Sequence, residues 1–288
     1  MCDDDIHQGL VHDPRQKAHL SRRGFALAAA GLGLAASSAY AGVTSTRVSV
    51  KTPDGLADAA LFAPEATGKY PAVLLWTDIL GLRPVFENMG KRLAAEGYVV
   101  LVPNPYYRVK KAPVIEGTFD FSVPADREKL TPLRASMTPD GTARDAVAFL
   151  AFLDAQASTD ATCKAGAQGY CMGGPLSFRT AGAVPERIGA VASFHGGGLI
   201  TDQPGSPHQV IPATHAEYLV AVAQNDDVRE PAVKDTLKAA FAAAGRPATV
   251  EVYAGDHGWT VKGSQVYNET EAERAWSNLL SLYKRVLV

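Results

Sequence analysis

The sequence has few cysteines, no basic run and no apolar stretch long enough to cross a membrane as a helix. It holds 3 Cys among 288 residues, and its formal net charge is −2. Because no cluster of Lys and Arg alternates with aromatic residues, the chain lacks the surface expected for nucleic acid. The longest apolar stretch ends near Ala39 and has about 15 residues, whereas roughly 20 span a bilayer. We therefore expect no nucleic-acid partner and no stable membrane insertion.

That apolar stretch has the features of an export signal. It follows Ser21-Arg22-Arg23 and ends in Ala39-Tyr40-Ala41, the small-x-small pattern of a signal-peptidase site. Two adjacent arginines before a weakly hydrophobic segment are typical of the twin-arginine route. A buried Ala-rich helix and an uncleaved membrane anchor are the alternatives. We expect residues 1–41 to be a leader and twin-arginine signal peptide that engages the export machinery transiently. The mature protein, from about Gly42, would be periplasmic or extracellular.

Removal of this signal takes Cys2 away and leaves Cys163 and Cys171. An oxidising compartment would permit a disulfide between them. Along an extended strand, however, eight residues cover about 26 Å, and a disulfide needs Cα atoms within roughly 7 Å. We therefore predict two separate thiols.

Residues 42–288 show no repeat, linker or composition break, so we expect a single domain. Short apolar runs alternate with segments of helical spacing, which is typical of an α/β protein whose mostly parallel sheet has helices on both faces. We predict about eight strands, at 46–51, 57–63, 72–76, 98–102, 165–170, 188–194, 218–223 and 249–253, the first two forming an antiparallel hairpin at a sheet edge. We predict helices at 84–96, 142–155, 174–183, 231–244 and 268–284, with Asp140 as the N-cap of the second. Functional groups in such sheets lie at the carboxyl ends of the strands.

One long connection, residues 105–139, carries scattered prolines and aromatics without a sustained period. Connections of this length in a compact domain are usually lids or binding loops. Arg108, Phe119 and Phe121 are available to line a pocket. A surface excursion with local packing is the alternative.

The segment Gly169-Tyr170-Cys171-Met172-Gly173 follows a predicted strand and precedes a predicted helix. It matches the nucleophile-elbow pattern G-x-S-x-G with cysteine in place of serine. Glycines on both sides allow a tight turn, and the helix N-terminus favours a thiolate and a developing oxyanion. The alternative is a buried small cysteine in a glycine-rich turn.

Two later segments supply partners for this cysteine. Asp226 and Asp227 follow the strand at 218–223, and His257 follows the strand at 249–253. The order nucleophile, acid, histidine is the one expected for an α/β-hydrolase. We predict a triad of Cys171, Asp226 and His257, in which the acid fixes the tautomer of the histidine. Asp227 is the alternative acid, and a turn or N-cap role is open for either residue.

From residue 43 to the C-terminus the chain resembles the dienelactone hydrolase family, the carboxymethylenebutenolidases. The resemblance rests on TDILGL at 77–82, VPNPYYR at 102–108, GYCMGG at 169–174, the Asn225-Asp226 turn and GDHG at 255–258. It implies an α/β-hydrolase fold and an activity that opens unsaturated lactones.

The resemblance also assigns roles. It places the oxyanion hole at the backbone amides of Met172 and Ile79, and it makes Arg108 the group that grips a substrate carboxylate. It makes Asp78 a group that helps to activate the thiol, although the family typically has glutamate there, which is longer by one C–C bond. A surface role is the alternative for Arg108.

A second departure lies four residues past His257, where the family typically has another carboxylate-binding arginine. This chain has Val261, followed by Lys262. Together with Trp259, this indicates a more apolar pocket. His195, at the end of another predicted strand, is expected to form part of the pocket wall. No second ligand stands at a zinc-like spacing from it, so we expect no metal and no cofactor.

The sequence therefore predicts an exported cysteine hydrolase that opens lactones or cleaves small carboxylic esters through an acyl-thioester, as a monomer or dimer. A carboxylesterase acting on neutral esters is the second hypothesis. A catalytically silent scaffold that binds a small ligand is the third, because a fold does not by itself imply an activity.

Overall fold

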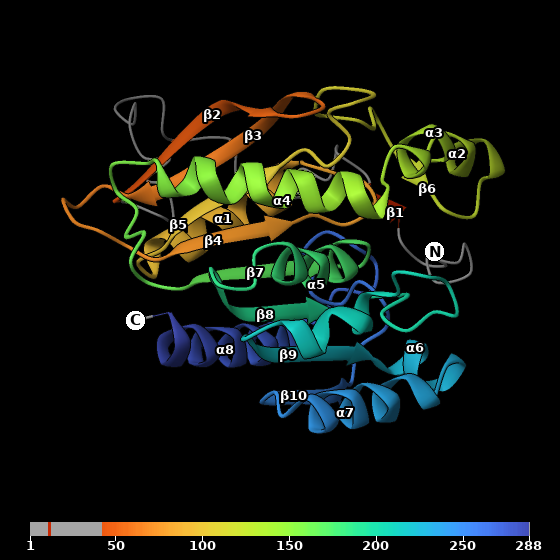
Figure 1. Ribbon diagram of the computed structural model, residues 1–288. Helices are drawn as coiled ribbons and strands as arrows, with labels where there is room; N and C mark the ends of the chain where they lie inside the picture. Colours follow the sequence, from red (N-terminus) through yellow and green to blue (C-terminus); the bar gives the residue numbers. More distant parts are fainter. Residues whose placement is uncertain (1–10, 13–41, 288) are drawn as a thin grey trace, which may run out of the picture.

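The computed structural model describes residues 11–12 and 42–287. Its centre is an eight-stranded sheet with the order β10-β9-β8-β7-β4-β5-β3-β2, which Figure 1 shows from the β2–β3 hairpin at the top to β10 at the bottom. The strands are β2 (Val43–Thr52), β3 (Gly55–Pro64), β4 (Ala72–Trp76), β5 (Val99–Pro103), β7 (Ala165–Tyr170), β8 (Ile188–Phe194), β9 (Glu217–Ala223) and β10 (Ala248–Tyr253).

The sheet is parallel from β5 to β10, and only the β2–β3 hairpin runs antiparallel to its neighbours. Every residue of β4, β5, β7 and β8 is buried, as expected for central strands that are covered on both faces. At the hairpin edge, Val48 is half-buried and Val50 buried while Ser49 and Lys51 are exposed, which confirms the predicted alternation.

Helices cover both faces of this sheet (Figure 1). On one face α1 (Pro84–Ala95) and α8 (Glu269–Val286) pack through Phe86, Leu93 and Leu279 into one apolar core. On the other face the helices are α4 (Pro139–Asp154), α5 (Gly173–Ala183) and α7 (Ala232–Ala244), which bury residues such as Phe149, Leu176 and Phe241. The short α6 (Gln224–Arg229) and the 3-10 helix η2 (Pro207–Ala213) complete this side.

The long connection between β5 and α4 forms a third, smaller apolar cluster beside the sheet. It contains β6 (Phe119–Asp120), α2 (Pro124–Glu128) and α3 (Thr131–Ala135). β6 pairs antiparallel with β1 (Val11–His12). The cluster consists of Ile79, Leu80, Tyr106, Val114, Phe119, Phe121, Leu130 and Leu133.

The predicted mostly parallel eight-stranded sheet with helices on both faces is confirmed. The N-cap predicted for the helix at 142–155 is wrong. That helix, α4, begins at Pro139, and Thr138 caps it by accepting a 3.0 Å hydrogen bond from the amide of Gly141. Pro139 suits the first helical position, and this moves the start three residues upstream of the predicted one.

The leader and signal peptide predicted for residues 1–41 lie outside the described residues except for Val11–His12. Among the described helices, none combines the length and the apolar character that a membrane span requires. Cys163 and Cys171 are separate thiols in the described part of the chain, as the spacing argument predicts.

Candidate active site

Cys171 stands on a strained turn between β7 and α5. Its φ is +53°, in the left-handed region that residues with a side chain rarely adopt. The turn is held by a 3.0 Å hydrogen bond from the Cys171 amide to the Phe194 carbonyl, at the end of the neighbouring strand β8. A Cβ at Gly173 would lie 2.6 Å from the carbonyl oxygens of Trp76 and Thr77, so this position has room only for glycine. The sequence motif thus folds as the elbow expected of a nucleophile.

The acid and the histidine come from the ends of β9 and β10. His257 is fully buried at its side chain, and its Nδ1 lies 2.6 Å from Oδ2 of Asp226. The backbone amide of His257 donates to Asn225 Oδ1 at 2.8 Å, which fixes the loop against the start of α6. Asp227 instead pairs with Lys234 at 2.7 Å. Asp226 is therefore the carboxylate that can orient the imidazole, as the sequence prediction preferred.

Cys171 and His257 line one small pocket at the carboxyl ends of the strands. Its other walls include Ile79, Phe121 and Val261, and its volume is about 30 Å³. That volume holds one or two water molecules, and little else. Phe121 brings the long connection to this pocket, as predicted, while Phe119 packs edge-to-face behind it at 4.7 Å between ring centroids.

The residues expected to supply the oxyanion hole are linked by one tyrosine that the sequence did not single out. Tyr106 is fully buried, and its hydroxyl donates to the carbonyl of Ile79 at 2.8 Å. The same oxygen lies 3.1 Å from Sδ of Met172. Tyr106 thus fixes the loop after β4 relative to the residue that follows the nucleophile, and the two amides of the predicted oxyanion hole belong to these residues.

Asp78 lies in the pocket, but its carboxylate is engaged by a residue that sequence reasoning missed. Arg83 donates to Asp78 Oδ1 at 2.5 Å and to Oδ2 at 2.7 Å, and Oδ1 also accepts from the amide of Leu80 at 3.0 Å. Arg83 and Asp78 are both more than nine-tenths buried, and both line the pocket. The thiol-activating role predicted for Asp78 therefore requires that its bond to Arg83 loosen, because the aspartate is held by a bidentate ion pair.

The structure does not bring Arg108 to this pocket. The guanidinium binds Asp145 through two 2.8 Å hydrogen bonds and Asp54 through one of 2.6 Å. It also lies over the ring of Tyr107, 4.6 Å from the ring centroid. The expected grip on a substrate carboxylate is thus corrected: two protein carboxylates occupy this fork, and Arg108 ties the β2–β3 turn to α4.

His195 and Trp259 stand behind the catalytic histidine. His195 lines the pocket, with its ring edge-on to His257 at 4.9 Å between centroids, and its Nε2 lies 2.8 Å from Thr260 Oγ1. Trp259 is fully buried, edge-on to His195 at 5.1 Å and stacked on Tyr253. The pocket-wall role predicted for His195 fits this position. Trp259, predicted as a substrate contact, is one ring removed from the cavity and supports His195 instead.

Burial, followed by the nearby His257, holds the pKa of His195 well below its ordinary value of 6.5. Asp226 and Asp78 attract a proton to the ring and oppose this shift only in part. His195 is therefore neutral in the folded protein near neutral pH, and it adds no positive charge beside His257.

This lowered pKa predicts a pH-dependent stability. Below about pH 6.5 the unfolded chain takes up a proton at His195 that the folded protein excludes, so the free energy of unfolding falls as the pH falls, by up to about 1.4 kcal/mol per pH unit. Above pH 6.5 this contribution is fully present. Urea unfolding between pH 5 and 7.5 should show a flatter dependence for His195→Phe than for the wild type. His215→Gln, at an exposed site, is the control, and equal slopes for wild type and His195→Phe would contradict the assignment.

Three or more metal-ligating side chains do not gather anywhere in the part of the chain that the structure describes. The chemistry available at this site is therefore that of a thiol, an imidazole and a carboxylate at the end of a helix.

A model of the dienelactone hydrolase family matches residues 57–287 of this chain. A protein of Methylorubrum extorquens, provisionally named a carboxymethylenebutenolidase, is 26% identical over 250 residues, which make up 85% of this chain and 82% of that protein.

Solved structures resemble the same region. One from Klebsiella pneumoniae, provisionally named a dienelactone hydrolase, has a TM-score of 0.71 at 20% identity and covers 84% of this chain and 99% of its own. The dienelactone hydrolase-like promiscuous phosphotriesterase P91, from metagenomic libraries, has a TM-score of 0.63 at 22% identity and covers 86% of this chain and 100% of its own. At these identities the likeness shows the fold, which is that of the α/β-hydrolases. With the family model spanning most of its length, the chain belongs to the dienelactone hydrolase family and is a hydrolase.

Proposed function

We propose that this hydrolase cleaves carboxylic esters and opens lactones with Cys171 as its nucleophile. The observation that carries the proposal is the strained elbow at Cys171, which opens into the same buried pocket as a His257–Asp226 pair. The N-terminus of α5 follows the thiol directly, and its partial positive charge favours both a thiolate and an oxyanion there.

In the first half of the reaction the Cys171 sulfur attacks the carbonyl carbon of the ester. A C–S bond forms, and the carbonyl electron pair moves to the oxygen, where the amides of Met172 and Ile79 stabilise the charge. The intermediate collapses by expelling the alkoxide, which takes a proton from His257. Asp226 accepts the Nδ1 hydrogen bond of His257 and stabilises the imidazolium in this step.

In the second half water hydrolyses the acyl-thioester. His257 removes a proton from the water, the oxygen adds to the carbonyl carbon, and the C–S bond breaks to return the thiol and release the carboxylic acid. For a lactone the alcohol and the acid are parts of one molecule, and the product is a hydroxy acid.

The charge of the substrate separates two forms of the proposal. Arg83 and Lys262 line the pocket and favour a carboxylated lactone. Three facts favour neutral esters: Val261 forms an apolar wall, the Arg83 charge is matched by Asp78, and Arg108 is engaged elsewhere. A carboxylesterase on neutral esters is therefore the second candidate.

One experiment separates these forms from each other and from a silent scaffold. The full chain is assayed for opening of a carboxylated dienelactone, by loss of ultraviolet absorbance, and for cleavage of p-nitrophenyl acetate, with Cys171→Ala as the blank. Turnover of the lactone that depends on Cys171 supports the family activity. Cleavage of the phenyl ester alone moves the substrate to neutral esters, and a burst of acylation at Cys171 without turnover in either assay would leave a ligand-binding scaffold.

We further propose that the protein is exported through the twin-arginine route. The proposal rests on Arg22-Arg23 and the short apolar stretch that ends in Ala39-Tyr40-Ala41. Replacing both arginines in the double variant Arg22→Lys, Arg23→Lys should keep the protein in the cytoplasm, as measured by activity or immunodetection in separated cell fractions. Arg15→Lys, outside the pair, is the control and should be exported normally. Equal export of the double variant would contradict this route.

A further inference from the structure

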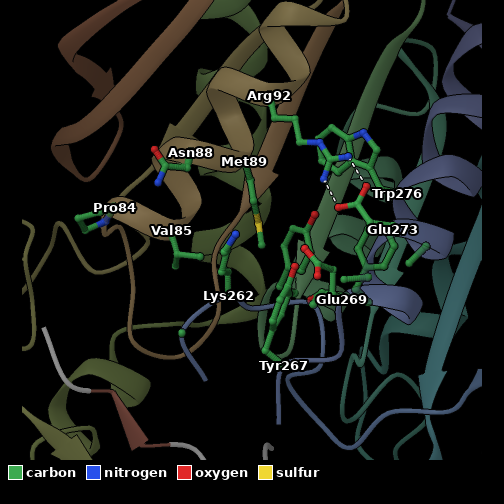
Figure 2. A pocket seen from close by; sticks show the side chains of 16 residues that line it. Pro84, Val85, Asn88, Met89, Arg92, Lys262, Tyr267, Glu269, Glu273 and Trp276 are labelled. Atoms are coloured by element: carbon green, nitrogen blue, oxygen red, sulfur yellow. Dashed lines mark hydrogen bonds and ion pairs between the residues drawn. The ribbon is translucent and has the colours of Figure 1, made fainter. Parts of the chain in front are cut away.

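A large groove adjoins the small catalytic pocket. It has a volume of about 770 Å³ and lies between the first halves of α1 and α8. Figure 2 shows Val85 and Met89 from α1 facing the same space as Tyr267 and Trp276. We call this space the α1–α8 groove. Its floor is formed by the carboxyl ends of β7 and β8, through Tyr170 and Phe194.

The two helices that flank the groove are tied together. Arg92 of α1 donates to both carboxylate oxygens of Glu273 of α8, at 2.5 and 2.7 Å, as the dashed lines in Figure 2 mark. The same guanidinium lies over the ring of Trp276, 4.1 Å from its centroid. Trp276 is itself more than nine-tenths buried. The groove is therefore formed before any ligand enters, which lowers the ordering cost of binding.

The groove and the catalytic pocket meet. Val85, Lys262 and Gly263 line both. The floor of the groove also reaches the site from behind, because Tyr170 immediately precedes the nucleophile and Thr260 contacts His195. A molecule lying in the groove thus has a direct path to Cys171.

The sizes of the two spaces divide the tasks between them. The catalytic pocket, about 30 Å³, admits a reacting carbonyl group but not the body of a substrate. The groove, about 770 Å³, falls in the range of cavities that bind whole small molecules. Aromatic and aliphatic side chains predominate on its walls, so burial of an apolar group there is favourable.

Polar groups in the groove do not demand a charged ligand body. Arg92 is matched by Glu273, and Glu269 stands at the outer end of α8. Lys262 at the junction is the exception, since the residues described for this chain offer its ammonium no ion pair. An acidic group therefore fits best at the junction, and an apolar group fits in the groove beyond it.

We propose that the α1–α8 groove is the subsite for an extended apolar part of the ester, a medium-length alkyl chain or an aromatic ring system, and that it sets the substrate preference. This inference rests on the ester hydrolysis proposed for Cys171. It names as substrates esters or lactones that carry a bulky apolar group, in place of the smallest members of the class.

Two series of esters test the proposal with the full chain. One series lengthens the acyl group from p-nitrophenyl acetate to p-nitrophenyl octanoate, and the other lengthens the alcohol from ethyl acetate to octyl acetate, followed by acid release. Each methylene that enters the groove should raise kcat/KM up to about fourfold. In at least one series we expect the longest ester to exceed the shortest at least tenfold.

A tryptophan placed in the groove should remove this preference. Ala272 lines the groove from α8, and Ala272→Trp should lower the long-to-short ratio of kcat/KM at least tenfold. Asn88→Trp, at an exposed position on the opposite wall, is a second test should the first variant fold poorly. Ser281→Trp, exposed on the same helix about 12 Å along its axis from Glu273, is the matched control and should leave the ratio unchanged.

The results separate the groove from the nucleophile. A ratio near one in both series of the wild type, or an unchanged ratio in both groove variants, would overturn the groove as a subsite while leaving Cys171-dependent hydrolysis intact. Absence of Cys171-dependent hydrolysis of every ester would overturn the proposed function, and with it this inference. Binding of octanoic acid to Cys171→Ala, measured by calorimetry, should weaken at least tenfold on addition of Ala272→Trp.

Discussion

Replacing Cys171 with alanine is expected to lower kcat for any ester that the protein cleaves by at least about 10⁴-fold. The side chain is the only group on the strained elbow that can form the acyl intermediate, and its loss leaves His257 with no nucleophile to activate. In hydrolases of related design, removing one triad member costs nearly as much as removing all of them. Initial rates on p-nitrophenyl acetate, with mass spectrometry of the acylated protein, measure the effect.

The second thiol provides the matched control. Cys163 lies just before β7, half-buried and outside the catalytic pocket, so Cys163→Ala should keep kcat within about twofold of the wild type. The mass added on brief exposure to the activated ester should appear on Cys171 and not on Cys163. Full activity in Cys171→Ala would refute the cysteine mechanism and would require another nucleophile or a directly activated water.

The fold could be predicted because its strands depend on local patterns. The apolar run at Ala72–Trp76 and the run at Ile188–Phe194 are strands with the predicted bounds, since a central parallel strand is buried on both faces and needs a continuous apolar sequence. The elbow could be predicted for a related reason. Its glycine spacing is a local requirement of a tight turn, and only a few residue types meet it.

The missed features depend on pairs of residues that are distant in the sequence. Arg108 was expected at the substrate, but its partners Asp54 and Asp145 approach it only when the β2–β3 turn and α4 pack together. Arg83 shows the opposite case: it lies five residues from Asp78, yet neither residue alone signals that the loop between them folds back. Charge pairing of this kind follows from tertiary geometry, which residue type and spacing do not specify.

The groove was missed for a similar reason. Its walls come from α1, α8 and the loop between His257 and α8, and each helix alone has an ordinary amphipathic pattern. A helix buries an apolar stripe against the sheet, but the pattern does not reveal where two neighbouring helices diverge. The tie between Arg92 and Glu273 joins residues 181 positions apart, and only the folded chain shows it.

Replacing Gly169 with alanine is expected to destabilise the protein by at least about 3 kcal/mol and to abolish hydrolysis. A Cβ at this position would lie 1.8 Å from the carbonyl oxygen of Gly173 and 2.1 Å from its carbonyl carbon. Both atoms belong to the backbone of the elbow, so no side chain can move aside to relieve the overlap. The turn would have to open, and insertions that force backbone shifts in a packed core are among the most damaging single changes.

Urea unfolding, followed by far-ultraviolet circular dichroism, measures the loss, and Gly68→Ala is the control. At Gly68 an added Cβ meets only the end of the Tyr70 side chain, at 2.9 Å from its hydroxyl, in an exposed loop where that ring can shift. Gly68→Ala should therefore change the stability by less than about 1 kcal/mol. A Gly169→Ala protein of normal stability and activity would mean that the chain between β7 and α5 passes through a wider turn. The strain at Cys171, and with it the alignment of the thiol with His257, would then need another origin.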